Sequence, residues 1–221
     1  MKKLRNMDVY KTAVSDIKYV AMVHEVQWAL NRWIASKNSD VAPGVLIGSL
    51  AMSFYAAPRT TMDIDLLFLS KKDIPKTVKG FQKQGPSAFL EIKNNIVVDV
   101  KTPEAFNGLV PPEIAQKIFH TAINHGGILV ASREGMIALK LCGAEIARRK
   151  FQYLGDVQRL MEEPLDVSTH DWDLANPPWS MHQDVSMHDW GLTEKQLSEV
   201  EKIRKACEEY NKLLKNRKIT D

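Results

Sequence analysis

A Gly-Ser pair, Gly48-Ser49, is followed fourteen positions after the serine by Asp63-Ile64-Asp65, and this pattern constrains the chain most. Residues 45–47 form a brief apolar run that ends at the glycine, and residues 50–57 are rich in helix-forming residues. Because side chains alternate between the two faces of a strand, both aspartates would point the same way. The sequence therefore predicts a strand, a tight turn, a short helix and a second strand with two carboxylates on one face.

Two carboxylates on one face of an apolar strand repel each other unless a cation lies between them. Aspartate is depleted in strands, so an ordinary exposed strand fits this pattern poorly. Hard divalent ions such as Mg²⁺ take oxygen ligands and bind phosphates, and a Gly-Ser turn offers N–H groups and a hydroxyl to a phosphate. These parts predict a metal-dependent phosphoryl or nucleotidyl transfer site. Solvent-exposed aspartates, or a site that binds without catalysing, are the alternatives.

A third carboxylate is expected from a neighbouring strand. Asp99 interrupts the valine-rich run 96–100, where its charge is costly to bury unless something binds it. Asn94-Asn95 predicts a turn before this run, and residues 91–93 then read as its hairpin partner. The alternative is an aspartate at the end of a strand, next to a turn.

The combination resembles the nucleotidyltransferase superfamily, whose signature is Gly-Ser or Gly-Gly, a spacer and then Asp-x-Asp. Residues 58–65, Pro-Arg-Thr-Thr-Met-Asp-Ile-Asp, are similar to the Arg-x-Thr-x-Asp-Ile-Asp run of AbiEii-type toxins and their relatives. The thirteen-residue spacer of this chain is at the long end of the family range.

The resemblance implies a nucleotidyltransferase fold, which is an α/β (α+β) architecture with a small mixed sheet, packed helices and a C-terminal helical part. It implies transfer of a nucleoside monophosphate from an NTP to an acceptor hydroxyl, with Mg²⁺ as cofactor. Asp63, Asp65 and Asp99 would be the catalytic metal ligands, and Gly48 and Ser49 would hold the phosphates. In the toxin branch the acceptor is commonly the 3′ end of tRNA, so a tRNA acceptor and a partner antitoxin are expected.

A second similarity lies further along the chain. Residues 135–141 resemble the lysine-bearing helix of the family, which makes Lys140 a candidate NTP-binding residue. Basic residues 148–150 and Asp156 fill the places that follow it in the family. A lysine that reaches solvent from an apolar helix, and an aspartate that begins a helix over residues 157–161, are the alternatives.

Two other functions fit the same residues. One is a nucleotidyltransferase that acts on a small molecule or a protein side chain. The other is a catalytically silent module that binds NTP or RNA.

Length and composition bound the domain organisation and the compartment. The 221 residues predict a nucleotidyltransferase domain over 1–160, including an N-terminal helix, and a tryptophan-rich loop with a packed C-terminal helix over 161–221. The sequence contains no apolar run near the length of a membrane span and no secretory signal, so no membrane partner and a cytoplasmic location are expected. Two cysteines, Cys142 and Cys207, read as free buried thiols.

Local patterns predict further elements. Helices are expected over 15–36, 74–84, 114–121, 136–149 and 193–216, and a strand is expected over 128–130. Ser132 is the expected N-cap of the helix 136–149, and Thr193 with Gln196 is a candidate capping box.

A short tandem duplication precedes the last helix. Residues 166–172 recur as 184–190 with six of seven positions identical. A loop that tryptophans hold against the domain is expected. A zinc site from His170, His182 and His188 and an RNA-stacking platform are the alternatives.

Overall fold

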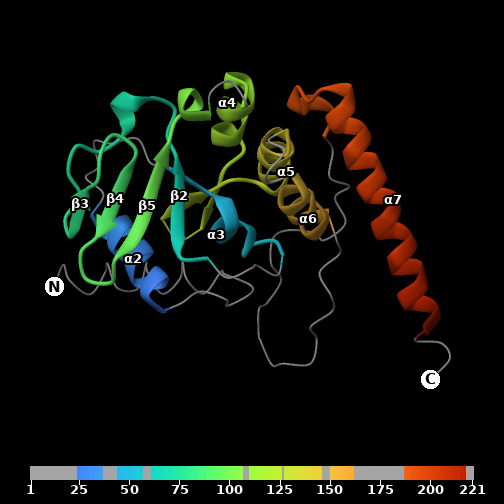
Figure 1. The fold of residues 1–221 in the computed structure, drawn as a ribbon, viewed down its shortest axis with the longest axis horizontal. Helices are drawn as coiled ribbons and strands as arrows, with labels where there is room; N and C mark the ends of the chain where they lie inside the picture. Colours follow the sequence, from blue (N-terminus) through green and yellow to red (C-terminus); the bar gives the residue numbers. More distant parts are fainter. Residues whose placement is uncertain are drawn as a thin grey trace.

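A mixed seven-stranded sheet forms the centre of this computed structural model, which describes residues 24–36, 44–56, 61–106, 110–125, 127–145, 150–161 and 187–217 (Figure 1). The strand order is β3-β4-β5-β2-β1-β7-β6. The strands are β1 Val45–Ile47, β2 Asp63–Leu67, β3 Phe81–Lys83, β4 Ala88–Glu91, β5 Ile96–Lys101, β6 Ile123–His125 and β7 Ile128–Val130. The α/β architecture predicted from the sequence, with a small mixed sheet, is thus confirmed.

Six α-helices accompany the sheet in the described part of the chain. They are α2 His24–Ala35, α3 Gly48–Met52, α4 Pro112–His120, α5 Arg133–Gly143, α6 Lys150–Met161 and α7 Glu194–Arg217. Short 3₁₀ turns are η1 Lys71–Asp73, η2 Pro103–Phe106 and η4 His188–Trp190. In Figure 1, α5 and α6 lie between the sheet and α7. None of the described helices is long and apolar enough to cross a membrane.

The middle of the sheet is formed by β5, β2 and β1, which are the strands that carry the predicted site. Strand β2 is parallel to β5 and antiparallel to β1, and β1 is parallel to β7. Ile64 and Leu66 of β2 and Val98 and Val100 of β5 are fully or almost fully buried. Their alternation with polar residues buries one face of each strand and leaves the other face for the aspartates.

Helix α2 confirms the predicted apolar stripe where the structure describes it. Val26, Leu30 and Trp33 are buried, and the Trp33 ring meets the rings of Phe81 and Phe89 edge-on at centroid distances of 5.2 and 5.3 Å. Residues 15–23 of the predicted helix lie outside the described residues.

The helix predicted over 74–84 is wrong. Residues 74–80 form turns and extended chain, and Phe81 begins β3, which pairs antiparallel with β4. Pro75 disfavours helical backbone at Ile74, which is extended with φ −72° and ψ 125°. Gly80 has φ 88°, which ends any regular helix before the strand. The apolar positions that looked helical, such as Val78 and Phe81, are buried individually by a turn and a strand.

Helices α3, α5 and α6 depart from their predicted bounds. Helix α3 ends at Met52, and the backbone N–H groups of Ser53 and Phe54 bond three residues back, in turns. Helix α5 begins after the predicted N-cap Ser132, whose hydroxyl accepts from Gly135 N, but it ends at Gly143. The ring of Tyr153 on α6 lies so close that a Cβ at Gly143 would be 2.7 Å from it, so the glycine lets α6 pack against the end of α5.

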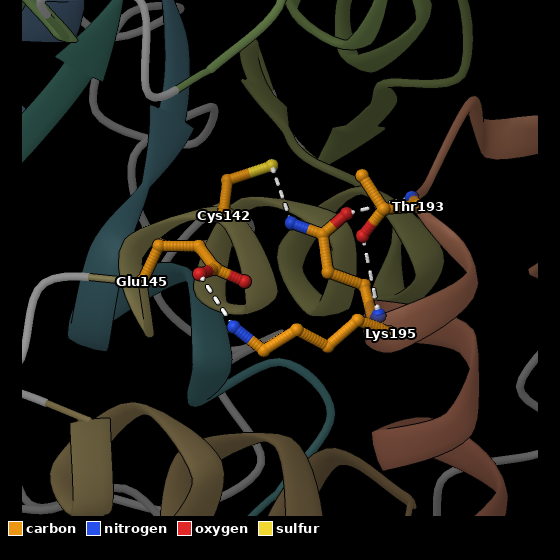
Figure 2. A network of polar contacts seen from close by, with 5 residues as sticks. Cys142, Glu145, Thr193 and Lys195 are labelled. Carbon is orange, nitrogen blue, oxygen red and sulfur yellow. Dashed lines mark hydrogen bonds and ion pairs between the residues drawn. The ribbon is translucent and has the colours of Figure 1, made fainter.

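The predicted capping box of the last helix is confirmed. Thr193 N donates to Gln196 Oε1 at 2.9 Å, and Gln196 N donates to Thr193 Oγ1 at 3.3 Å. The Gln196 amide also donates to Cys142 Sγ, and Lys195 pairs with Glu145 at 3.0 Å, as Figure 2 shows. These contacts join the start of α7 to the end of α5.

Both cysteines are free and buried, as predicted. Burial raises the pKa of the Cys142 thiol to about 11, so this thiol is protonated and unreactive at neutral pH.

The last four residues of the duplication, 187–190, lie in the described part of the chain and pack on the domain. Trp190 in η4 is only 5% exposed and lies against Gly135. The Lys117 ammonium lies 5.0 Å from the centre of the Trp190 ring and donates to the carbonyl of Asp189. Trp190 is therefore buried against the domain, as expected, while Trp172 of the first repeat lies outside the described residues. Residues 166–186, which include His170 and His182 of the alternative zinc site, lie outside the described residues.

Replacing Trp190 by alanine is expected to lower the melting temperature, because burial of such a side chain contributes about 1.5–3 kcal/mol. Differential scanning fluorimetry measures the change. Trp28→Ala is the matched control, since Trp28 is 42% exposed against 5% for Trp190 and its loss should matter less. Stoichiometric zinc that is lost together with stability in His170→Ala or His188→Ala would contradict the structural role.

Candidate metal centre

The pairing of β2 with β5 brings the three predicted aspartates together. In the parallel register, Asp65 lies opposite Asp99 and Asp63 lies opposite Val97. One carboxylate oxygen from each of Asp63, Asp65 and Asp99 lies within 4.8 Å of the other two. Asp63 is exposed, whereas Asp65 and Asp99 are half-buried, so the cluster opens to solvent at one end. Within the described residues, no other set of three or more acidic, histidine or cysteine ligands meets this geometry.

Two neighbouring side chains hold the aspartates of β2. Thr61 Oγ1 donates to Asp63 Oδ1 at 2.6 Å. The Lys101 ammonium, from the last residue of β5, forms an ion pair with Asp65 Oδ1. Neither residue was predicted to contact the triad, although Thr61 belongs to the run 58–65 described above. Both lie two positions from a predicted ligand. Lys101 shares strand β5 with Asp99, so the two-residue period of a strand would have placed its side chain on the same face as that aspartate.

The environment of Asp99 favours the protonated form of its carboxyl group. Burial raises its pKa above the ordinary value of 3.8; the Lys101 ammonium opposes this shift, and the carboxylates of Asp65 and Asp63 add to it. In the metal-free protein the ionised form of Asp99 is therefore less favourable than it is in water, as expected for a ligand of a cation.

This shift predicts a pH dependence of stability. In chelator-treated protein the folded state keeps the Asp99 proton to a higher pH than the unfolded state does. The unfolding free energy should therefore fall as pH rises from 3.8 through the raised pKa. Asp99→Asn removes this loss, so the variant should be more stable than the wild type above that window and equal to it below. Urea denaturation between about pH 4 and pH 7 measures the difference. A difference that stays constant over this range would contradict the assignment.

Gly48 lies directly against the cluster. It follows Ile47, which pairs with Asp65 across β1 and β2, and it has φ 76°, a conformation that side chains disfavour. A Cβ on Gly48 would lie 2.1 Å from Asp65 Oδ2. The glycine predicted from the sequence is thus required both by the turn and by the close approach of a carboxylate.

Ser49 is half-buried in the first turn of α3, next to Gly48. No side chain caps this helix start. The Gly-Ser turn therefore lies beside the carboxylates, in the arrangement that the sequence predicts.

Lys140 forms a buried ion pair rather than an exposed one. Its ammonium lies 2.7 Å from Asp156 Oδ2, and the two side chains are 6% and 2% exposed. The same ammonium lies 5.1 Å from the centre of the Tyr153 ring. Asp156 lies inside α6, which begins at Lys150, so an aspartate at a helix start is wrong, and so is a lysine that reaches solvent. The structure assigns Lys140 to the contact between α5 and α6, while its proposed contact with NTP stays a prediction.

The chain is thus a mixed α/β protein with an acidic triad on two central strands, next to a glycine turn. No model of a known protein family matches it. A search of curated proteins finds no match either. Its function is therefore inferred from the geometry of the triad and of the residues around it.

Proposed function

We propose that this protein is a metal-dependent nucleotidyltransferase with the corresponding fold. The observation that carries the proposal is the meeting of Asp63, Asp65 and Asp99 within 4.8 Å, with Gly48 against Asp65. Three carboxylates on adjacent strands suit a divalent cation, and the uncapped Gly-Ser turn beside them suits a phosphate bound to that cation.

The donor set fits magnesium. All three side chains offer hard oxygen ligands, and burial, followed by the neighbouring carboxylates, raises the pKa of Asp99, so a cation there would favour its ionised form. When bound, Mg²⁺ would neutralise the charge that develops on the phosphate oxygens during transfer.

The residues of the chain then take separate roles. Asp63 and Asp65 would hold the metal, with Thr61 keeping the Asp63 carboxylate in place. Asp99 would share the metal and orient the acceptor hydroxyl, and its raised pKa suits a group that accepts a proton. The N–H groups of Gly48 and Ser49 would bind the β and γ phosphates of the NTP.

For the acceptor we propose the 3′ end of tRNA, with an antitoxin as the partner that restrains the activity in the cytoplasm. This part of the proposal rests on the similarity of residues 58–65 to the AbiEii-type run. Arg59 and Thr60 of that run lie outside the described residues.

A labelling experiment tests the function. The purified protein is incubated with Mg²⁺, total tRNA and each of the four α-³²P-labelled NTPs in turn. We expect label from one or more NTPs on tRNA, removable by a 3′ exonuclease, and no label with Asp65→Ala. Label on a protein or small molecule would identify a different acceptor. Binding of NTP and Mg²⁺ by calorimetry without any transfer would identify a silent binding module.

A further inference from the structure

Lys101 shares the acidic face of β5 with Asp99. The two residues are separated by Val100, which is fully buried on the opposite face. In the register with β2, Lys101 lies opposite Leu67, and Asp99 lies opposite Asp65. The Lys101 side chain must therefore run diagonally back along the sheet to bring its ammonium to Asp65.

The ammonium lies against one of the three carboxylates that would hold the metal. It contacts Asp65 Oδ1, and Asp65 Oδ1 or Oδ2 must also serve the metal if Asp65 is a ligand. The Asp65 carboxylate has little freedom to move away from the ammonium. A Cβ built on Gly48 would lie 2.1 Å from Asp65 Oδ2, so the backbone of the Gly-Ser turn closely approaches this second oxygen. The Asp65 side chain is 16% exposed and the Lys101 side chain 33%, so water screens this pair only in part.

We propose that Lys101 is a displaceable counter-ion, which neutralises Asp65 in the metal-free protein and competes with the divalent cation for that carboxylate. The inference rests on the proposed function only in that the triad binds a metal. Three carboxylates so close together repel one another, and a single ammonium offsets part of that repulsion. A divalent cation offers twice the charge and direct coordination, so it takes Asp65, and the long, flexible lysine side chain moves aside.

A counter-ion that competes with the metal affects the metal-free (empty) and metal-bound states differently. Lys101 stabilises the empty state, so it lowers the affinity of the site for metal. A lysine with only a structural role would stabilise both states equally and leave the metal affinity unchanged.

Mn²⁺ is the probe for the test, because electron paramagnetic resonance reports its free concentration directly. We expect Lys101→Met to bind Mn²⁺ about tenfold more tightly than the wild type. The substitution removes the partly screened attraction between the ammonium and Asp65, which competes with the metal for that carboxylate. Lys101→Arg keeps the charge and should stay close to the wild type. Lys76→Met removes the same charge from an exposed position, and its Kd should change by no more than about twofold.

Thermal unfolding gives a second readout. In EDTA, Lys101→Met should melt below the wild type, and saturating Mn²⁺ should raise its melting temperature by more than that of the wild type. Lys101→Gln, which keeps a polar side chain, replaces the methionine variant if that protein does not fold.

The outcomes separate this inference from the proposed function. A wild-type protein that binds no Mn²⁺ overturns both. If the wild type binds Mn²⁺, two results would overturn the counter-ion role alone. One is an unchanged Kd for Mn²⁺ in Lys101→Met. The other is a loss of melting temperature in Lys101→Met that is equal in EDTA and in Mn²⁺. Tighter binding in Lys101→Met and Lys101→Gln, but not in Lys101→Arg, supports it.

Discussion

Asp65→Ala is expected to abolish nucleotidyl transfer, with a loss in kcat/KM of about a thousandfold or more, because a metal ligand and its electrostatic stabilisation disappear together. Asp65 is the most connected member of the triad. It lies opposite Asp99, pairs with Lys101 and is in close contact with Gly48. Asp63→Ala should have a similar effect on transfer, because its carboxylate belongs to the same cluster. Incorporation of labelled nucleotide into the acceptor measures the loss.

The fold should survive these substitutions. Asp63 is exposed and Asp65 half-buried, and neither lies in the apolar core. Circular dichroism and the melting temperature in EDTA check this. Glu113→Ala, which removes an exposed carboxylate from the first turn of α4, is the control for a general charge effect. Normal turnover by both aspartate variants would remove these residues from the chemistry.

The structure also refines what relief of charge repulsion should do to the metal-free protein. Like charges so close together repel one another, so removing one aspartate would by itself raise the stability of the metal-free protein. Asp65, however, already has a counter-ion in Lys101, and Asp63 accepts a hydrogen bond from Thr61. Burial raises the pKa of Asp99, so Asp99→Asn is the substitution expected to stabilise the metal-free fold at neutral pH.

The triad could be predicted because its signals are local. Two aspartates with strand spacing inside apolar residues identify one face of β2, and an aspartate in a valine run identifies β5. Neither observation needs a distant residue. The Gly-Ser turn was equally readable, since a glycine after an apolar run marks a change of direction.

Contacts between distant segments were not readable in this way. The ion pair of Lys101 with Asp65 depends on the register of two strands that are separated by three other elements, η1, β3 and β4. The close packing of the Tyr153 ring on Gly143 joins α5 to α6, and it depends on how the two helices meet in space. Seven strands in the order found here require pairings that local periodicity does not encode.

The error over residues 74–84 has a different cause. Apolar residues there recur with helix-like spacing, but Pro75 and Gly80 hold the backbone in extended and left-handed conformations. These two residues were visible in the sequence, and their conformational limits outweigh periodicity in a segment this short.

Gly48→Val is expected to destabilise the fold and to abolish metal and nucleotide binding. The backbone at Gly48 has φ 76°, which costs a non-glycine residue about 1–2 kcal/mol. In addition, the new Cβ would lie 2.1 Å from Asp65 Oδ2 and 3.0 Å from Asp65 Cβ, so the carboxylate must leave its place in the triad. Mn²⁺ affinity and the melting temperature in EDTA measure the two effects separately.

Gly191 offers a matched control for the backbone term. It has φ 64°, and a Cβ built there meets no atom within 4 Å. Gly48→Ala and Gly191→Ala therefore carry similar conformational strain, whereas only Gly48→Ala displaces a carboxylate. We expect both to lower the melting temperature and only Gly48→Ala to weaken Mn²⁺ binding. Because Asp65→Ala removes the atom that clashes first, the stability cost of Gly48→Ala should be smaller in that background, and a double-mutant cycle measures this coupling. Equal costs in both backgrounds, with unchanged Mn²⁺ affinity, would place the phosphate and metal site away from this turn.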